Sequence, residues 1–313
     1  MKGGDFPHLL IYGPSGAGKK TRVHSLLKEV FGATVDKQRI EHQVIVTPSR
    51  RKVEIRTVAS NVHIEVNPSD VGNDDRVVIQ ELIKAHASTT ALQMDARINL
   101  KVVVVTEADK LTREAQQSLR RTMEKFMSSC RLILVAEQCS RLLPAIKSRT
   151  LQLRVPAPSV EEIGTLVCDV ADKEGQEISE DMGRRIAVAA GRNVRRALLM
   201  AESMCMSKAA APVLPHWQSF LKKLAKKVVD KPTPAGVDEI RADLFQLMAL
   251  MLPTELIFEH LVRELMPLVS SDRARVALID LASAYEYRSR ISNKAIIHIE
   301  AFIAQLMLAC KAA

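Results

Sequence analysis

The sequence predicts an α/β fold in which helices cover a parallel sheet on both faces, followed by a largely helical second half. In residues 1–157, short apolar runs such as 8–13 and 101–109 alternate with segments of helical periodicity. Apolar strands without polar alternation are typical of a parallel sheet that is buried on both sides. After a proline-containing break at 156–159, the pattern is helical almost throughout.

The first part of the chain begins with a strand over 8–13, a glycine-rich loop and a helix over 19–31. Residues 42–70 alternate, which predicts two or three strands with a basic turn at 49–52. The remaining expected elements are a helix over 75–86, a strand over 101–109, a helix over 114–126 that Thr112 caps, and a strand over 130–137.

Two breaks, at 156–159 and 211–215, predict three domains: 1–157, 158–212 and 213–313. We expect short helices in the second domain and longer ones in the third. In the last helix, apolar residues recur with helical spacing at Ile299, Phe302, Ile303, Leu306, Met307 and Cys310. This stripe predicts a face packed on a core, either that of its own domain or that of a neighbouring subunit.

Composition narrows the class of protein. The chain carries 45 basic and 36 acidic residues, and the whole excess lies in residues 1–157, with 25 basic and 16 acidic. This excess of basic residues indicates either a polyanionic partner such as nucleic acid or a role in solubility alone. The five cysteines form no CxxC pair, so we expect no zinc site and a reducing compartment. No apolar run is long enough for a transmembrane helix, so no membrane partner is expected.

A phosphate-binding loop is the main motif. It comprises Gly13, Pro14, Ser15, Gly16, Ala17, Gly18, Lys19, Lys20 and Thr21. Glycines let consecutive N–H groups face a phosphate, the following helix N-terminus adds partial positive charge, and Lys19 would reach the β and γ phosphates. The next position normally offers a hydroxyl to Mg²⁺, but here it is the cation Lys20, while Thr21 stands one residue further along.

The acidic strand end that partners such a loop is also incomplete. An Asp-Glu pair there normally holds Mg²⁺ and polarises the attacking water. Here the strand ends in Thr106 and Glu107, so only the glutamate is present. We expect a site that binds phosphate and has lost hydrolysis, and no metal ligand is assigned.

Two arginines admit both a structural and a functional interpretation. Arg149 follows the last strand of the first domain, and Arg195 begins a helix of the second. Each is either a solvated surface residue or a phosphate ligand. Arg149 would act as an arginine finger on a neighbouring subunit, and Arg195 would reach the loop across the domain junction.

Together these segments resemble a clamp-loader ATPase of the AAA+ P-loop NTPase type, in particular the small subunits of eukaryotic replication factor C. The resemblance is carried in order by "DFPHLLIYGPSGAGKKTR", "RIEHQVIVTPS", "HIEVNPSD", "DDRVVIQELIK", "TEADKLTREAQQSLRRTMEKF", "CRLIL", "IKSR", "VPAPS" and "NKAIIHIEAF". The doubled lysine and the missing strand-end aspartate are similar to the family member with a degenerate nucleotide site.

The resemblance implies a nucleotide-binding domain over 1–157, a helical lid over 158–212 and an all-α collar over 213–313 that serves oligomerisation. It implies bound ATP or ADP, with Mg²⁺ doubtful, and Arg149 supplied in trans. The usual polar sensor is Glu137 here, and its carboxylate would repel a γ-phosphate. The family also carries a segment over the adenine before the first strand. This sequence begins shortly before Phe6, so we expect base recognition to differ.

The implied partners are the other subunits of a nuclear hetero-pentamer, a sliding clamp and primer–template DNA. Gln116 and Arg120 match a helix that couples nucleotide state to DNA. DNA contacts are expected at Arg76, Lys110 and Arg113, and clamp contacts around 80–93. A self-sufficient ATPase of the helicase or chaperone type, and a scaffold subunit with an empty loop, are the alternatives.

Overall fold

The computed structural model describes residues 6–46, 52–88, 100–127, 129–209 and 211–312. The chain divides into two compact units, residues 1–212 and 213–313. No helix in the described part of the chain is both long and apolar enough to cross a bilayer.

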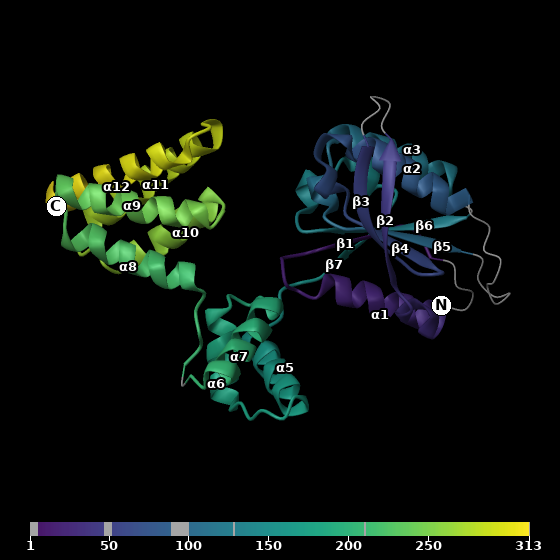
Figure 1. Cartoon of the computed structure of the whole chain (residues 1–313), viewed down its shortest axis with the longest axis horizontal. Coiled ribbons are helices and arrows are strands. Elements are labelled where there is room, and N and C mark those ends of the chain that lie inside the picture. Colours follow the sequence, from purple (N-terminus) through teal and green to yellow (C-terminus); the bar gives the residue numbers. More distant parts are fainter. Residues whose placement is uncertain (1–5, 47–51, 89–99, 128, 210, 313) are drawn as a thin grey trace. The chain divides into compact units, whose positions relative to one another are not determined.

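The first unit is built on a seven-stranded sheet in the order β2-β3-β4-β5-β6-β1-β7 (Figure 1). The strands are β1 (Leu9–Tyr12), β2 (Arg39–Val46), β3 (Lys52–Ala59), β4 (His63–Val66), β5 (Lys101–Val105), β6 (Cys130–Ala136) and β7 (Leu151–Arg154). From β4 to β7 all neighbours pair in parallel, whereas β2 and β3 add an antiparallel edge.

The prediction of a parallel sheet covered on both faces is confirmed, and β2 and β3 extend this sheet by an antiparallel edge. Consecutive strand residues face opposite cores: Leu10 packs with one apolar cluster, and Leu9 and Ile11 pack with the other. Helix α1 (Lys19–Phe31) covers one face, and α2 (Asp75–Ser88) and α3 (Arg113–Lys125) cover the other (Figure 1).

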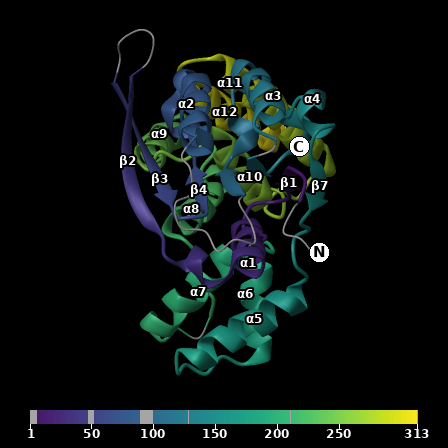
Figure 2. The same ribbon diagram turned by 90° about the vertical axis from the view of Figure 1, so that its right-hand side faces the viewer.

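The β2–β3 ribbon forms because 42–70 alternates, as predicted, and Figure 2 shows its two long strands side by side. Of the predicted basic turn at 49–52, only Lys52 lies within the described residues, at the start of β3. No strand was predicted over β7, whose four residues are all exposed and pair in parallel with β1.

Short helices complete the first unit. The 3₁₀ helices are Gly32–Asp36, Pro68–Asp74, Ala108–Lys110 and Cys139–Arg141, and α4 spans Pro144–Lys147. Three further helices follow the 156–159 break: α5 (Val160–Lys173), α6 (Glu180–Ala189) and α7 (Val194–Ser207). They enclose an apolar cluster of their own, and a full capping box between Ser159 and Glu162 starts α5.

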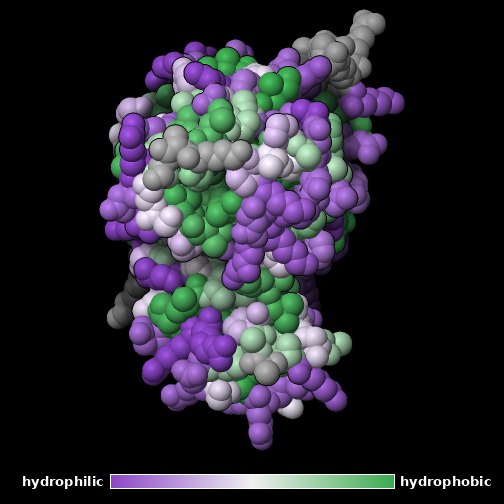
Figure 3. All heavy atoms as spheres, turned by 90° about the vertical axis from the view of Figure 1, so that its left-hand side faces the viewer, coloured by the Kyte–Doolittle hydropathy of each residue, from purple (hydrophilic) through white to green (hydrophobic). Residues whose placement is uncertain are grey.

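The second unit consists of α8 (His216–Asp230), α9 (Pro234–Ala249), α10 (Thr254–Leu265), α11 (Asp272–Ile291) and α12 (Ala295–Ala312). The α12 stripe packs into the core of its own unit, where Phe302 is fully buried against Phe258 at a ring-centroid distance of 5.5 Å. This decides between the two cores that the sequence left open. Apolar side chains also gather in patches on the outer surface of this unit (Figure 3).

Candidate nucleotide site

The glycine-rich loop connects the end of β1 to the first turn of α1. Two positions of this loop require glycine because neighbouring atoms lie too close for a Cβ. A Cβ on Gly13 would lie 1.9 Å from the Val155 carbonyl oxygen, and a Cβ on Gly16, whose φ is +71°, would lie 1.9 Å from Asn193 Oδ1. Gly18 caps α1 in the left-handed region and offers no side chain to the helix N-terminus. The first N–H groups of α1 therefore remain available to an anion.

The loop also contacts the turn that starts helix α7. The Val194 amide at the start of α7 donates to the Gly16 carbonyl at 3.1 Å. Arg192 donates to the carbonyls of Ala157 and Pro158, both at 2.8 Å, and so fixes the turn before α7 to the chain entering the lid. Together these bonds place Arg195 at the loop.

A cavity of about 390 Å³ lies over the loop. It brings together most of the residues that the sequence pointed to, from four different segments of the chain. Among its lining residues are Lys19, Lys20, Thr21, Thr106, Glu107, Glu137 and Arg195, together with Ser15, Gly16 and Gly18 of the loop. Gly13, Pro14 and Ala17 belong to the loop but do not line the cavity.

Lys19 is buried at the floor of this cavity. Its ammonium donates to the carbonyls of Gly13 at 2.7 Å and Pro14 at 2.8 Å. Burial lowers the pKa of Lys19, while the negative charges of Glu137 and Asp109 oppose this shift. A buried ammonium beside a glycine loop and a free helix N-terminus fits the phosphates of a nucleotide.

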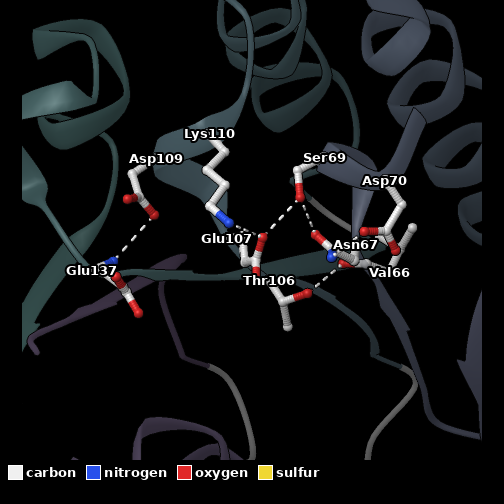
Figure 4. Close-up of polar contacts among 9 residues, drawn as sticks. All are labelled: Val66, Asn67, Ser69, Asp70, Thr106, Glu107, Asp109, Lys110 and Glu137. Atoms are coloured by element: carbon white, nitrogen blue, oxygen red, sulfur yellow. Dashed lines mark hydrogen bonds and ion pairs between the residues drawn. The ribbon is translucent and has the colours of Figure 1, made fainter. Parts of the chain in front are cut away.

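Thr106 takes no part in a metal site. It is buried at the end of β5, and its hydroxyl donates to the Val66 carbonyl at 3.2 Å (Figure 4). The same carbonyl accepts the Thr106 amide at 3.0 Å. The side chain is thereby built into the pairing of β4 with β5 and holds no negative charge toward the cavity.

The Glu107 carboxylate is engaged by its own surroundings. It accepts hydrogen bonds from Lys110 and Ser69, both at 2.9 Å (Figure 4). These bonds, that of Lys110 foremost, lower the pKa of Glu107, and the same pair raises the pKa of Lys110. A general base for hydrolysis needs a pKa nearer to neutrality, so the shift runs opposite to what catalysis requires.

Lys20 forms an ion pair with Glu65 of β4, which also lines the cavity. With a cation at position 20 and an engaged Thr106 and Glu107, the ligands that Mg²⁺ takes in this fold are absent or committed elsewhere. Within the described part of the chain, no group of three or more histidines, cysteines, aspartates or glutamates suits a metal ion. The residues present therefore fit the polyphosphate and do not fit Mg²⁺.

Glu137 follows β6 and opens onto the cavity. Its amide donates to Asp109 Oδ1 at 3.1 Å, and Asp109 is buried (Figure 4). This bond fixes the backbone at the end of β6, so that the exposed Glu137 side chain adds negative charge where the sequence analysis expected a polar sensor.

Arg149 does not line the cavity of its own subunit. It follows α4, and its guanidinium pairs with Glu124 near the end of α3 at 2.8 Å while also donating to the Ala145 carbonyl at 2.9 Å. The side chain is partly exposed, at 36%. It lies at the surface, held by a single carboxylate.

Gln116 is buried in α3 and bonds the chain that leads into α4. Its amide nitrogen donates to the carbonyls of Leu111 at 3.1 Å and Arg141 at 3.3 Å, and its oxygen accepts the Leu143 amide at 2.9 Å. Gln116 and Glu124 thus connect α3 to both ends of the segment that carries Arg149. Arg120 is exposed one turn beyond Gln116.

A groove of about 700 Å³ runs along α2, α3 and α4, and Arg76, Arg120 and Arg121 line it. Of the residues expected to contact DNA, Arg76 pairs with Glu114 at 3.5 Å, and Lys110 is committed to Glu107. Arg113 is exposed at the first turn of α3. The predicted clamp-contact stretch 80–93 is described only up to residue 88.

The sequence analysis missed several residues that shape the site. Glu65 pairs with Lys20, and Ser69 donates a hydrogen bond to Glu107. Asn193 lies so close to Gly16 that a Cβ there would clash with it. Asn193 carried a signal that was overlooked, because it directly precedes a helix and caps it by accepting the Arg196 amide at 3.1 Å. The sequence pattern gave no signal for the other two.

The parallel sheet, the glycine loop at the end of β1 and the lid contact define an AAA+ P-loop NTPase fold. Family models agree with this along the chain. Residues 3–159 match "DNA polymerase III, delta subunit", residues 167–206 match "RCF1/5-like, AAA+ ATPase lid domain", and residues 217–313 match "Replication factor C subunit 3, C-terminal domain".

Whole-chain relatives give the particular family. The chain is 46% identical to replication factor C subunit 3 of Homo sapiens over 309 residues, which cover 97% of this chain and 86% of that protein. It is 44% identical to replication factor C subunit 5 of Neurospora crassa over 309 residues (97% and 88%) and 40% identical to subunit 5 of Saccharomyces cerevisiae over 316 residues (97% and 89%). The chain belongs to the replication factor C small subunits of the clamp-loader family.

Proposed function

We propose that this chain is the replication factor C subunit that binds nucleotide but hydrolyses it weakly or not at all, and that it lends Arg149 to the ATP of a neighbouring subunit. Its hetero-pentamer loads the sliding clamp, proliferating cell nuclear antigen, onto primer–template DNA in the nucleus in an ATP-dependent way. Residues 1–157 are the nucleotide-binding domain, 158–212 the lid and 213–313 the oligomerisation collar.

The observation that carries the proposal is the state of the strand end beside the loop. The Thr106 hydroxyl is bonded to Val66, and the Glu107 carboxylate is bonded to Lys110 and Ser69. The cavity therefore keeps the groups that hold phosphate, Lys19 and the helix N-terminus, but has no free carboxylate at the strand end to activate water. This combination supports retention of ATP or ADP without efficient turnover.

The placement of Arg149 supports a role in trans. The residue does not line its own cavity and is partly exposed, with Glu124 as its carboxylate partner. An arginine finger exchanges such a partner for a phosphate of the neighbouring subunit. The bonds from Gln116 would relay the position of α3 to Arg149, as expected for a helix that couples nucleotide state to DNA.

The basic groove along α2 and α3 supports a contact with the DNA backbone. We assign this contact to Arg76, which lines the groove together with Arg120, and to Arg113, which is exposed at the first turn of α3 outside that lining. Lys110 would join them only by exchanging Glu107 for a DNA phosphate. Phosphate contacts position a duplex without reading its sequence, which suits a loader that acts at any primer end. Substituting Arg76 or Arg113 by alanine should weaken duplex binding by the complex equally for unrelated sequences and reduce its salt dependence.

The test is ATP turnover by the reconstituted complex with clamp and primed DNA. We expect Arg149→Ala to slow ATP hydrolysis at the neighbouring site about 10³-fold or more, so that total turnover by the complex loses the contribution of that one site. Lys19→Ala should change total turnover little. Arg263→Ala is a matched control, because this exposed arginine of α10 also pairs with one carboxylate, Glu259 at 2.7 Å.

Other results would point to other functions. Efficient turnover by the isolated chain, lost in Lys19→Ala, would identify a self-sufficient ATPase and refute the proposal. A chain that binds no nucleotide, in a complex that Arg149→Ala leaves fully active, would identify a scaffold subunit.

A further inference from the structure

We infer that Lys20 takes the place of the divalent cation, so that this loop binds the polyphosphate of a nucleoside di- or triphosphate without a metal ion. The inference rests on the proposed function in one respect, namely that the loop binds nucleotide. It adds the residue that replaces the metal and the partner that holds this residue when no phosphate is present.

The position of Lys20 supports this inference. It is the second residue of α1, directly after Lys19, and lines the same cavity. A lysine ammonium has three N–H donors and a flexible stem, and the ion pair with Glu65 leaves donors for a phosphate oxygen. Its side chain is 58% exposed, so no packing prevents it from turning toward the loop.

The groups around Lys20 suit an ammonium and not a metal. The Thr106 hydroxyl is bonded to the Val66 carbonyl, and Glu107 is held by Lys110 and Ser69. A Mg²⁺ ion would have to bind beside the Lys20 cation with neither of these oxygen ligands available, and like charges repel strongly in a partly enclosed site.

The charge that lines the cavity supports the same inference. Three cations, Lys19, Lys20 and Arg195, face it together with three carboxylates, those of Glu65, Glu107 and Glu137. Glu107 remains neutralised by Lys110. When Lys20 exchanges Glu65 for phosphate, three cations face the ligand against the two carboxylates of Glu65 and Glu137, so the cavity keeps a net positive charge that suits a polyphosphate.

Glu65 therefore acts as a placeholder. It keeps the ammonium over the cavity in the absence of ligand and competes with phosphate for it. Removing its charge should favour phosphate binding, whereas removing the charge of Lys20 should weaken binding most where no metal is present to compensate.

The experiment measures binding of ADP and of ATP to the full chain by calorimetry, in buffer with Mg²⁺ and in buffer with EDTA. We expect wild-type affinity to agree within about twofold between the two buffers. Lys20→Thr, which restores the usual hydroxyl, should lower the affinity in EDTA about tenfold, as expected for loss of one charge-assisted hydrogen bond. Lys20→Arg should retain most of the affinity, and Glu65→Gln should raise it.

Lys28→Thr is the matched control. Lys28 lies on the same helix, is similarly exposed at 55%, and pairs with Asp36 outside the cavity. Replacing Lys28 by threonine removes the same charge outside the cavity, so the affinity for ADP and ATP should stay unaltered. Far-ultraviolet circular dichroism of each variant establishes that it is folded.

The outcomes separate this inference from the proposed function. Wild-type binding that requires Mg²⁺ would overturn the inference and leave the nucleotide site intact. Equal affinity of wild type and Lys20→Thr in EDTA would also overturn it, as would an equal loss in Lys28→Thr. Binding in neither buffer would overturn both the inference and the nucleotide site.

Discussion

Replacing Gln116 by leucine should loosen the chain that leads to Arg149 without disturbing the sheet. Gln116 is 4% exposed, and its side chain makes hydrogen bonds to Leu111, Arg141 and Leu143. Leucine fills a similar volume but leaves one amide and two carbonyls without this partner. At about 1 kcal/mol for each bond, the expected loss is about 2–4 kcal/mol, concentrated on the segment before α4.

Hydrogen exchange measures this loss locally. The Leu143 amide donates to Gln116 Oε1 at 2.9 Å, so its exchange should accelerate about 30-fold or more in Gln116→Leu. Gln117→Leu is the control, because Gln117 is the exposed neighbour on the same helix. Amides of β5 and β6 should exchange as in the wild type in both variants.

Unchanged protection of Leu143 in a folded Gln116→Leu chain would refute the reasoning. It would show that the segment before α4 is held by packing alone. If the bonds of Gln116 also position Arg149, the variant should lower turnover by the complex in the same direction as Arg149→Ala. A variant with accelerated exchange and full turnover would separate the structural role of Gln116 from any coupling role.

Three further predictions concern stability, each measured by urea unfolding of the full chain. Gly16→Ala should lower the free energy of unfolding by about 2 kcal/mol, because it combines left-handed backbone strain with displacement of the Asn193 cap. Gly18→Ala should lower it by about 1 kcal/mol, since the added Cβ meets no atom within 4 Å. Equal losses in the two variants would contradict this reasoning. Phe302→Ala should cost about 3–5 kcal/mol, because the side chain is fully buried, and a loss under about 1 kcal/mol would show that the site collapses. Burial lowers the pKa of His86 from 6.5 to about 4, so the neutral form is favoured in the fold, and stability should fall by about 2 kcal/mol from pH 7 to pH 5, a fall that His86→Gln should reduce.

Local patterns predicted much of the first unit. The strands β1, β5 and β6 are short apolar runs, and α1 begins and ends where its periodicity and flanking glycines indicate. The strand β7 escaped prediction because its four side chains are all exposed, and only backbone pairing with β1 makes it a strand. Leu151 and Leu153 do alternate with polar residues, but four positions are the shortest run from which alternation predicts a strand.

Sequence patterns identified which residues depart from the usual motif, but not which residues they contact. Spacing identified Lys19, and comparison with the usual motif marked Lys20 and Thr106 as departures. What those residues do instead depends on contacts with β4, forty or more positions away from each along the chain: Thr106 bonds Val66, and Lys20 pairs with Glu65. Such contacts follow from strand order, which no local pattern specifies.

The bond between Thr106 and Val66 has a consequence for how this lineage can change. An aspartate at position 106 would set a carboxylate against the Val66 carbonyl in a buried position, where threonine now donates a hydrogen bond. Introducing at position 106 the aspartate of the usual motif would therefore lower stability by itself, because the lost hydrogen bond and the buried charge act in the same direction. The backbone pairing of β4 with β5 thus restricts which residues position 106 can accept.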